Sequence, residues 1–308
     1  MFNSFLKFSI IAAFLILYGF TESFAQYWRK DRAEIIGSLG STNFLGELGG
    51  RNSTGVGSFS DLELNTTRPA ASFGYRYSLS AFTKIRGSLS WGILSGDDQF
   101  TDEPFRNNRN LHFRSQIVEL SGIYEIYFNR ERGGHRYSIA GAKGMRAKNS
   151  TYYGFIGIGG FYFNPKAFYN GSWVALQPLG TEGQGLPGEG PKYSRLNVAV
   201  PMGLGMRYAI DEFWKIGVEI GYRKTFTDYI DDVSTEYYDN DILRAERGDE
   251  AADIADPNKG SFDLQLDKMS GKSKHGMTRG NPNRLDSYLF AMFSINYTIQ
   301  KKTTRAKF

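Results

Sequence analysis

The sequence predicts an all-β fold: an eight-stranded antiparallel transmembrane β-barrel with short periplasmic turns and long surface loops. Segments of about ten residues alternate apolar side chains with polar or glycine residues, as strands with two different faces do. The connections between these segments are short and long in turn, which is the asymmetry of bacterial outer-membrane barrels. Among the 308 residues, the abundant Tyr (19), Phe (24) and Gly (36) fit aromatic girdles and tightly curved strands.

The clearest of these segments runs from Trp214 to Arg223. One face carries Trp214, Ile216, Val218, Ile220 and Tyr222, and the other carries Lys215, Gly217, Glu219, Gly221 and Arg223. The first face is apolar with an aromatic residue at each end, which suits a strand whose two ends lie at the membrane interfaces. We expect the second face, which is charged or glycine, to line the barrel interior.

Seven further segments show the same pattern: 33–43, 71–79, 83–94, 115–128, 152–163, 195–208 and 287–299. An even number of strands returns the chain to the side from which it started. Pro201 falls on the inward face of its strand and predicts a bulge there. Residues 164–194 are expected to form a loop, and the stretch 241–255 is expected to form a short helix. A soluble lipocalin-like barrel would place the apolar face inside, which the alternating charges argue against.

The N-terminal residues predict a cleaved signal peptide. Lys7 supplies a positive charge, residues 8–20 form an apolar run, and Ser23-Phe24-Ala25 is a small-x-small cleavage site. The apolar run is shorter than the roughly 20 residues that a membrane-spanning helix needs, which argues against an N-terminal anchor. We therefore divide the chain into a signal peptide (1–25), an outer-membrane barrel (26–300) and a basic C-terminal tail (301–308).

The inward faces of the predicted strands carry charges of both signs. The predicted lumen charge network comprises Arg76, Arg86, Glu119, Glu125, Arg207, Lys215, Glu219 and Arg223, with Glu34 and Lys84 also inward. Side chains fill the interior of an eight-stranded barrel, so we expect opposite charges to pair across it as a structural plug. A path for protons or ions through the same groups is the alternative.

Three aspartates, Asp228, Asp231 and Asp232, follow the strand that ends at Arg223, and we expect them at the barrel rim. Carboxylates this close in sequence could bind Ca²⁺ through their oxygens. They do not have EF-hand spacing, and aspartates at loop starts commonly accept hydrogen bonds from nearby backbone. The sequence therefore predicts a rim carboxylate cluster and no metal or cofactor site.

Composition and motifs exclude several other functions. The absence of cysteine excludes disulfides and thiol chemistry. A formal net charge of +5 with no basic stripe argues against a nucleic-acid partner. We predict no catalytic residues; an outer-membrane lipid-modifying enzyme, which would use His112 with Ser115, is the alternative.

Several irregular motifs carry a family resemblance: Phe44-Leu45-Gly46-Glu47-Leu48-Gly49-Gly50, Leu94-Ser95-Gly96-Asp97-Asp98, Arg109-Asn110-Leu111, Gly160-Phe161-Tyr162-Phe163-Asn164-Pro165, Leu176-Gln177-Pro178-Leu179-Gly180 and Thr225-Phe226-Thr227-Asp228-Tyr229-Ile230-Asp231-Asp232-Val233-Ser234. The last is the most specific. Together they resemble the PorG-like outer-membrane β-barrel proteins of the type IX secretion system, over nearly the whole mature chain.

This resemblance implies a non-enzymatic accessory or scaffold subunit that associates with periplasmic ring or motor proteins of that machine. The chain would reside in the outer membrane of a Gram-negative bacterium, surrounded by outer-membrane lipid. We expect the basic connection Asn129–Ser150 to contact the ring. A stand-alone surface-binding barrel of unassigned role is the remaining alternative.

Overall fold

The computed structural model describes residues 32–48, 64–101, 103–129, 150–211, 213–260 and 272–299. The predicted signal peptide, the C-terminal tail and most of the segment 129–150 lie outside these residues. The described strands are β1 (Ala33–Leu45), β2 (Arg68–Ser78), β3 (Thr83–Asp97), β4 (His112–Tyr127), β5 (Ser150–Tyr169), β6 (Ser172–Ala175), β7 (Leu196–Ala209), β8 (Trp214–Thr225) and β9 (Ser287–Ile299).

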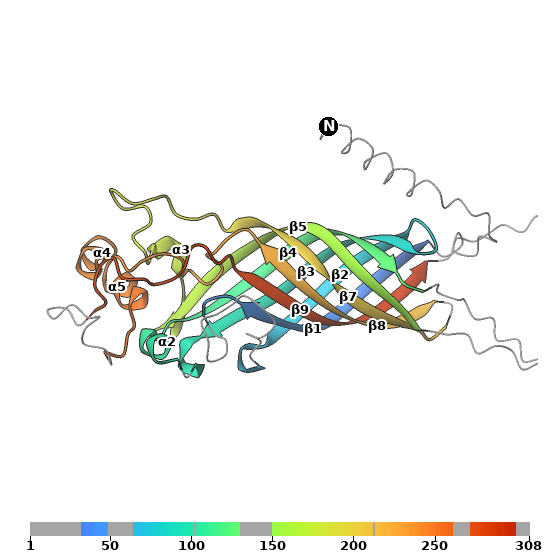
Figure 1. Ribbon diagram of the computed structural model, residues 1–308, viewed down its shortest axis with the longest axis horizontal. Helices are drawn as coiled ribbons and strands as arrows, with labels where there is room; N and C mark the ends of the chain where they lie inside the picture. Colours follow the sequence, from blue (N-terminus) through green and yellow to red (C-terminus); the bar gives the residue numbers. More distant parts are fainter. Residues whose placement is uncertain are drawn as a thin grey trace, which may run out of the picture.

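The strands form one closed antiparallel barrel (Figure 1). Each long strand pairs with its neighbour in sequence, β1 pairs with β9 in register Ala33↔Ile299, and β4 pairs with β5 to complete the ring. The short strand β6 pairs only with β5, so eight strands close the barrel as predicted. Closure leaves no unpaired edge among the eight barrel strands, which is the condition for a sheet to exist in lipid.

The alternation read from the sequence is the alternation of burial in the structure. Along β8, Lys215, Glu219 and Arg223 are buried inside the barrel, while Val218 and Ile220 are more than half exposed on the outer face. On β4 and the residue that follows it, the exposed apolar positions continue from Val118 to Phe128. At the strand tilt of such barrels this distance is about 25 Å along the axis, the thickness of the apolar band of an outer-membrane barrel.

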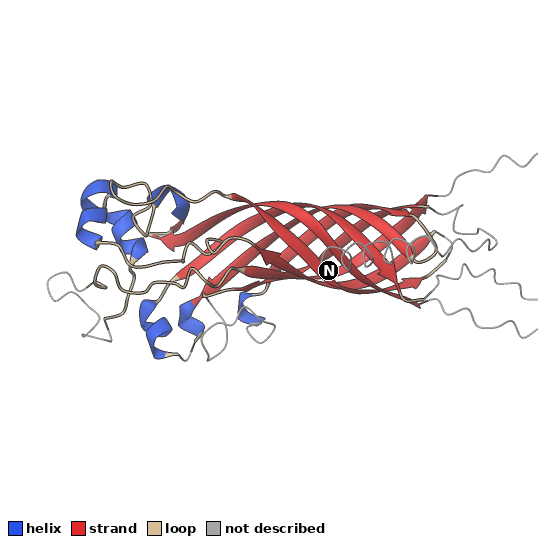
Figure 2. Ribbon diagram, turned by 45° about the horizontal axis from the view of Figure 1, so that its top comes forward, coloured by secondary structure: helices blue, strands red, loops and turns tan. Residues whose placement is uncertain are grey.

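The two ends of the barrel differ (Figure 2). At the end where β1 starts and β9 finishes, the described connections are tight turns: the Ser80 hydroxyl accepts from the Phe82 and Thr83 backbone N–H groups, and Asp211 Oδ1 accepts from Phe213 and Trp214. At the other end, long loops fold into a cap with the short helices η3 (Leu64–Thr66), η4 (Asp98–Phe100), α2 (Pro104–Arg109), α3 (Leu176–Leu179), α4 (Asn240–Arg247) and α5 (Asp249–Ala255). Within the described residues, none of the helices has the length and hydropathy needed to cross a membrane.

The structure corrects the sequence interpretation in two places. The predicted loop 164–194 contains β6, because β5 continues past the membrane and turns back at Asn170 and Gly171, both with positive φ. The bulge predicted at Pro201 was wrong. Pairing of β5 with β7 is interrupted beside Pro201, but Ile156↔Met202 and Gly159↔Ala199 share one register. The missing proline N–H therefore costs a ladder bond without adding a residue to the strand.

The stretch 241–255 was predicted to be helical, and it contains two helices. Gly248, with φ +86°, ends α4 and starts α5, because glycine adopts this backbone conformation without steric cost.

The outward position of Val218 can be tested directly. Val218→Arg places a charge in the middle of the apolar band and is expected to cost about 2–4 kcal/mol of unfolding free energy. Urea unfolding of the barrel in lipid vesicles measures this change, with Val218→Leu as the control. Equal stability of the two variants would contradict the lipid-facing assignment.

Candidate functional site

The carboxylate of Glu34 is the centre of the charge network in the half of the lumen nearest the short turns. It lies within ion-pair distance of four cations: Arg207 at 2.7 Å, Lys215 at 2.8 Å, Arg76 at 3.0 Å and Lys84 at 3.5 Å. These cations come from β7, β8, β2 and β3, so one side chain of β1 ties together four other strands. Glu34 is fully buried, and a buried carboxylate is tolerated only with such partners.

A second group of ion pairs lies beside the first. Glu125 is 2.7 Å from Arg76 Nε and 3.0 Å from Arg86 Nε. Arg86 also bonds to Glu219 at 2.8 Å, and the Tyr153 hydroxyl donates to the same carboxylate at 2.8 Å. Arg76 and Arg86 therefore bridge the carboxylates of Glu34, Glu125 and Glu219 into one continuous network.

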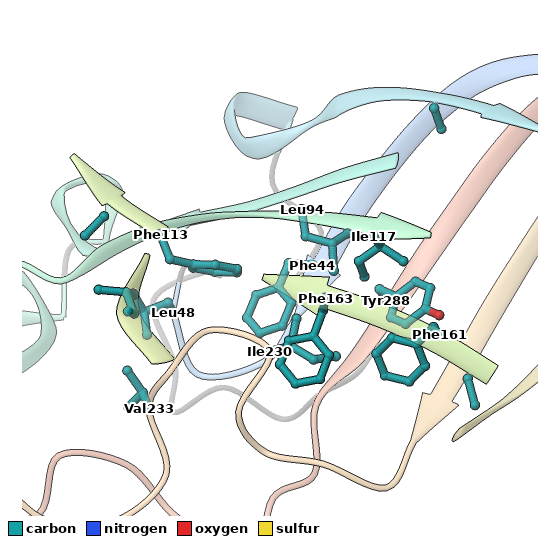
Figure 3. Close-up of a cluster of buried hydrophobic side chains, with 14 of the residues drawn as sticks. Phe44, Leu48, Leu94, Phe113, Ile117, Phe161, Phe163, Ile230, Val233 and Tyr288 are labelled. Atoms are coloured by element: carbon teal, nitrogen blue, oxygen red, sulfur yellow. The ribbon is translucent and has the colours of Figure 1, made fainter. Parts of the chain in front are cut away.

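Towards the cap the lumen becomes aromatic. Glu119 accepts from the Tyr288 hydroxyl at 2.8 Å and lies 3.5 Å from Arg223, whose guanidinium stacks over Phe290. Beyond this layer, a cluster of buried apolar side chains fills the barrel mouth (Figure 3). It includes Phe44, Leu48, Leu94, Phe113, Ile117, Phe161, Phe163, Ile230, Val233 and Tyr288. The sequence interpretation missed this layer, although inward phenylalanines on β4, β5 and β9 signal it.

A small cavity lies among the charges of the described lumen. A cavity of about 20 Å³ lies beside Arg86, Glu219 and Arg223, with serines of β2 and β3 in its wall. A space of this size holds about one water molecule. The ion pairs and the aromatic layer above them therefore form a plug, and this geometry favours the plug over an ion path.

The three predicted rim aspartates separate into two environments, and all are buried below the cap surface. Asp232 has φ +66° and accepts from the Thr181 hydroxyl at 2.5 Å and the Tyr193 hydroxyl at 2.6 Å. Its other partner is Arg279, at 3.9 Å. Asp232 is therefore a structural tie between loops.

Asp228 and Asp231 share a second environment with Asp286 and Glu47. Asp286 Oδ2 accepts from the Ile230 backbone N–H at 2.9 Å, Asp231 Oδ1 from Val233 at 3.0 Å, and Glu47 Oε2 from Asn281 at 2.9 Å. In contrast, both Asp228 oxygens, Asp231 Oδ2 and Asp286 Oδ1 are buried with no hydrogen-bond partner among the described residues. We call Asp228, Asp231, Asp286 and Glu47 the buried carboxyl cluster. Glu47 and Asp286 are distant from Asp228 in sequence, so no local signal could assign them to it.

Burial and mutual repulsion favour protons on this cluster. Burial, aided by the nearby Asp231 charge, raises the pKa of Asp228 to about 9. Burial likewise raises the pKa values of Asp231 and Asp286 well above the ordinary range, with Glu47 adding repulsion to both. Among the residues that the structure describes, no group of three or more histidine or carboxylate side chains has the arrangement of a metal site.

Described residues from four of the motifs that carry the family resemblance meet in the cap or at the barrel mouth. Arg109 links three of its segments: it bonds to Asp98 at 2.7 Å and donates to the backbone carbonyls of Glu47 and Arg279. Ile230 and Val233, from the motif Thr225–Ser234, insert into the apolar cluster at the barrel mouth. These motifs therefore build the cap, which explains why residues so far apart in sequence belong together.

The structure does not join His112 and Ser115 into a catalytic pair. His112 lies on the outer face of β4, where its Nε2 accepts from the Phe168 backbone N–H at 3.0 Å. Ser115 is fully buried on the inner side, and its hydroxyl accepts from the Asn164 backbone. Their opposite orientations follow from the odd spacing along a strand.

Several solved structures similar to this chain are outer-membrane barrels. OprG of Pseudomonas aeruginosa is 8% identical, with a TM-score of 0.40, covering 88% of this chain and 98% of that one. Ail, the attachment invasion locus protein of Yersinia pestis, is 10% identical, with a TM-score of 0.35 over 88% and 99%. The Neisserial surface protein A is 6% identical, with a TM-score of 0.36 over 87% and 97%. These similarities carry no argument about function. No protein-family model and no curated protein matches the chain.

The closed sheet, its apolar outer face and its charged interior define the class of protein. The chain is an eight-stranded transmembrane β-barrel of the outer-membrane type, filled by its own side chains and covered by a folded cap.

Removing the central charge of the lumen is expected to destabilise the barrel. Glu34→Gln leaves four buried cations short of one counter-charge and should cost about 3–5 kcal/mol of unfolding free energy. Urea unfolding in vesicles measures the loss. Glu246→Gln, at an exposed position on α4, removes the same charge and should be neutral. A neutral Glu34→Gln would show that the network does not stabilise the fold.

The buried carboxyl cluster predicts that the cap loosens as the pH rises. A group with a raised pKa in the folded state binds its proton more tightly there than in the unfolded chain. The proton on such a group contributes its full stabilisation of the folded state below the ordinary aspartate pKa of about 4. This stabilisation is lost as the pH rises through the pKa that the group has in the folded state. Hydrogen exchange of cap amides, corrected for intrinsic rates, should therefore accelerate between pH 5 and pH 9, the folded-state pKa of Asp228 being about 9.

Asp228→Asn should reduce this pH dependence and slow exchange at high pH. Glu250→Gln, at an exposed position on α5, provides the control and should leave the profile unchanged. A profile that is flat in the unsubstituted protein would show that the cluster does not hold protons that matter to the cap.

Proposed function

We propose that this chain is a non-enzymatic outer-membrane subunit of the type IX protein secretion machinery, acting as an accessory or scaffold component. The observation that carries the proposal is the filled lumen. Ion pairs centred on Glu34 and the apolar cluster near Phe161 fill the described part of the lumen, so the barrel is suited to holding a position in the membrane. The family resemblance supplies the machine in which it would act.

The resemblance gains support from where its motifs lie. Arg109, Asp98 and Glu47 are tied to one another, and Ile230 and Val233 pack beneath them. Short matches that arise from composition alone would not be expected to contact one another in the fold, as these motifs do. They describe a shared structure, and the secretion role is the function that this family resemblance implies.

A scaffold of this kind would contact its partners from the periplasmic side. The connection Asn129–Ser150 is basic in sequence, which suits an acidic partner; its cations are Arg130, Arg132, Arg136, Lys143, Arg146 and Lys148. The signal peptide 1–25 would direct export of the chain to the periplasm, and its cleavage would release the mature chain for insertion into the outer membrane. The apolar outer face would then bind outer-membrane lipid.

Deleting the gene tests the secretion role. If the proposal holds, proteins sorted to the type IX machine should accumulate inside the cell, and a plasmid copy should restore their secretion. Secretion through other routes provides the control. Normal type IX secretion in the deletion strain would contradict the proposal.

Crosslinking in living cells tests the side of contact. A photoreactive residue at Lys143 or Lys148 should capture ring or motor proteins, whereas one at Lys259 or Lys274 in the surface cap should not. Capture from the cap positions alone would place the contact at the cell surface. That outcome would favour the stand-alone surface-binding barrel, for which the folded cap is the supporting feature.

A further inference from the structure

Two cations lie side by side on the outer face of the barrel, next to the cap. Arg114 on β4 and Lys166 on β5 are direct register partners. Their chain neighbours Phe113, Ser115 and Ala167 are buried on the inner side, so the two cationic side chains point outwards. Side chains in such a register have Cβ atoms about 5 Å apart, and like charges in this position destabilise a sheet.

Nothing among the described residues neutralises this pair. No ion pair among the described residues involves Arg114, Lys166 or the nearby Arg195. Arg195 donates to Asn164 Oδ1 at 3.2 Å, and Asn164 lies two residues before Lys166 on the same outer face. Three cations therefore gather around one stretch of β5. Asp97 is the register partner of His112, which lies two residues before Arg114 on β4. Its carboxylate accepts a hydrogen bond from the Gln99 backbone N–H.

Aromatic rings hold two of these cations at the outer surface. The Arg114 guanidinium lies 5.6 Å from the centre of the Trp173 ring, and the Arg195 guanidinium lies 5.6 Å from that of Tyr162. Stacking orders the guanidinium groups while leaving their N–H edges able to donate. Ordered guanidinium edges beside a lysine are suited to bind phosphate oxygens.

The position along the barrel identifies the source of the phosphate. Val118 and Leu120 on β4, and Ile158 on β5, continue the same outer face directly towards the apolar band. Tyr162, the register partner of Val118, lies at the edge of this band, where aromatic girdles meet lipid headgroups. Trp173, the register partner of Phe168, lies on the cap side of the cation pair. A phosphorylated lipid can therefore place its phosphate at the Arg114–Lys166 pair and its acyl chains on the neighbouring apolar surface.

We propose that Arg114, Lys166 and Arg195 form a binding site for the phosphate groups of an outer-leaflet glycolipid. The ligand's phosphates neutralise the cation pair, and its acyl chains cover the exposed side chains below. This site rests on the barrel fold and not on the proposed secretion role. Its failure and the failure of that role are therefore separate results.

Native mass spectrometry of the full mature chain in detergent tests the site with diphosphoryl lipid A as the probe. Arg114→Gln with Lys166→Gln should weaken binding about twentyfold, since each cation near an anionic lipid surface contributes roughly fivefold. Lys259→Gln with Lys274→Gln removes the same charge from exposed cap positions and should leave binding unchanged. Heat-modified gel mobility confirms that both variants are folded.

Four outcomes would overturn the proposal. Equal binding by the Arg114/Lys166 variant and the unsubstituted chain would show that the pair does not bind this lipid. Equal weakening in the cap variant would show a general charge effect. Undiminished binding of dephosphorylated lipid A, or retention of inorganic phosphate at the pair without lipid, would show that the glycolipid phosphates are not what the site recognises.

Discussion

The structure depends on how charge is buried inside a closed barrel. A small barrel has no room for bulk water, so each ionised side chain in it needs a partner within bonding distance. Glu34 meets this condition for four cations at once, and Arg76 and Arg86 extend the same solution to Glu125 and Glu219. Breaking one contact leaves charges on several strands uncompensated, which makes the lumen a single structural unit.

The cap follows a different rule from the lumen. Its loops are held by apolar side chains that descend into the barrel mouth, and by buried links such as Arg109 with Asp98 and Arg279 with Glu182. The buried carboxyl cluster lies between these supports, and the nearby Arg109 and Arg279 offset only part of the rise that burial causes in the pKa of Asp231. The lumen pairs its acids with bases, whereas burial in the cap raises the pKa values of Asp228, Asp231 and Asp286.

Periodicity predicted the barrel because lipid and lumen impose opposite chemistry on alternate residues, as Trp214 to Arg223 illustrates. The same alternation placed all ten lumen charges on the inward faces. It did not show that Glu34 is the centre of the network, because which cations meet depends on strand tilt and side-chain reach. The buried carboxyl cluster could not be predicted from the sequence for a similar reason: Asp228 lies near Glu47 and Asp286 only because separate loops fold together. β6 was missed because four residues are too few to show a period.

The contacts of Glu34 have a consequence for assembly. Its strand, β1, forms the seam with β9, and its cationic partners come from β2 and β3 on one side and from β7 and β8 on the other. Pairing of β1 with β9 therefore brings cations from both sides of the seam onto one carboxylate. A barrel closed on any other pair of strands would leave these buried charges without the partners that they have here.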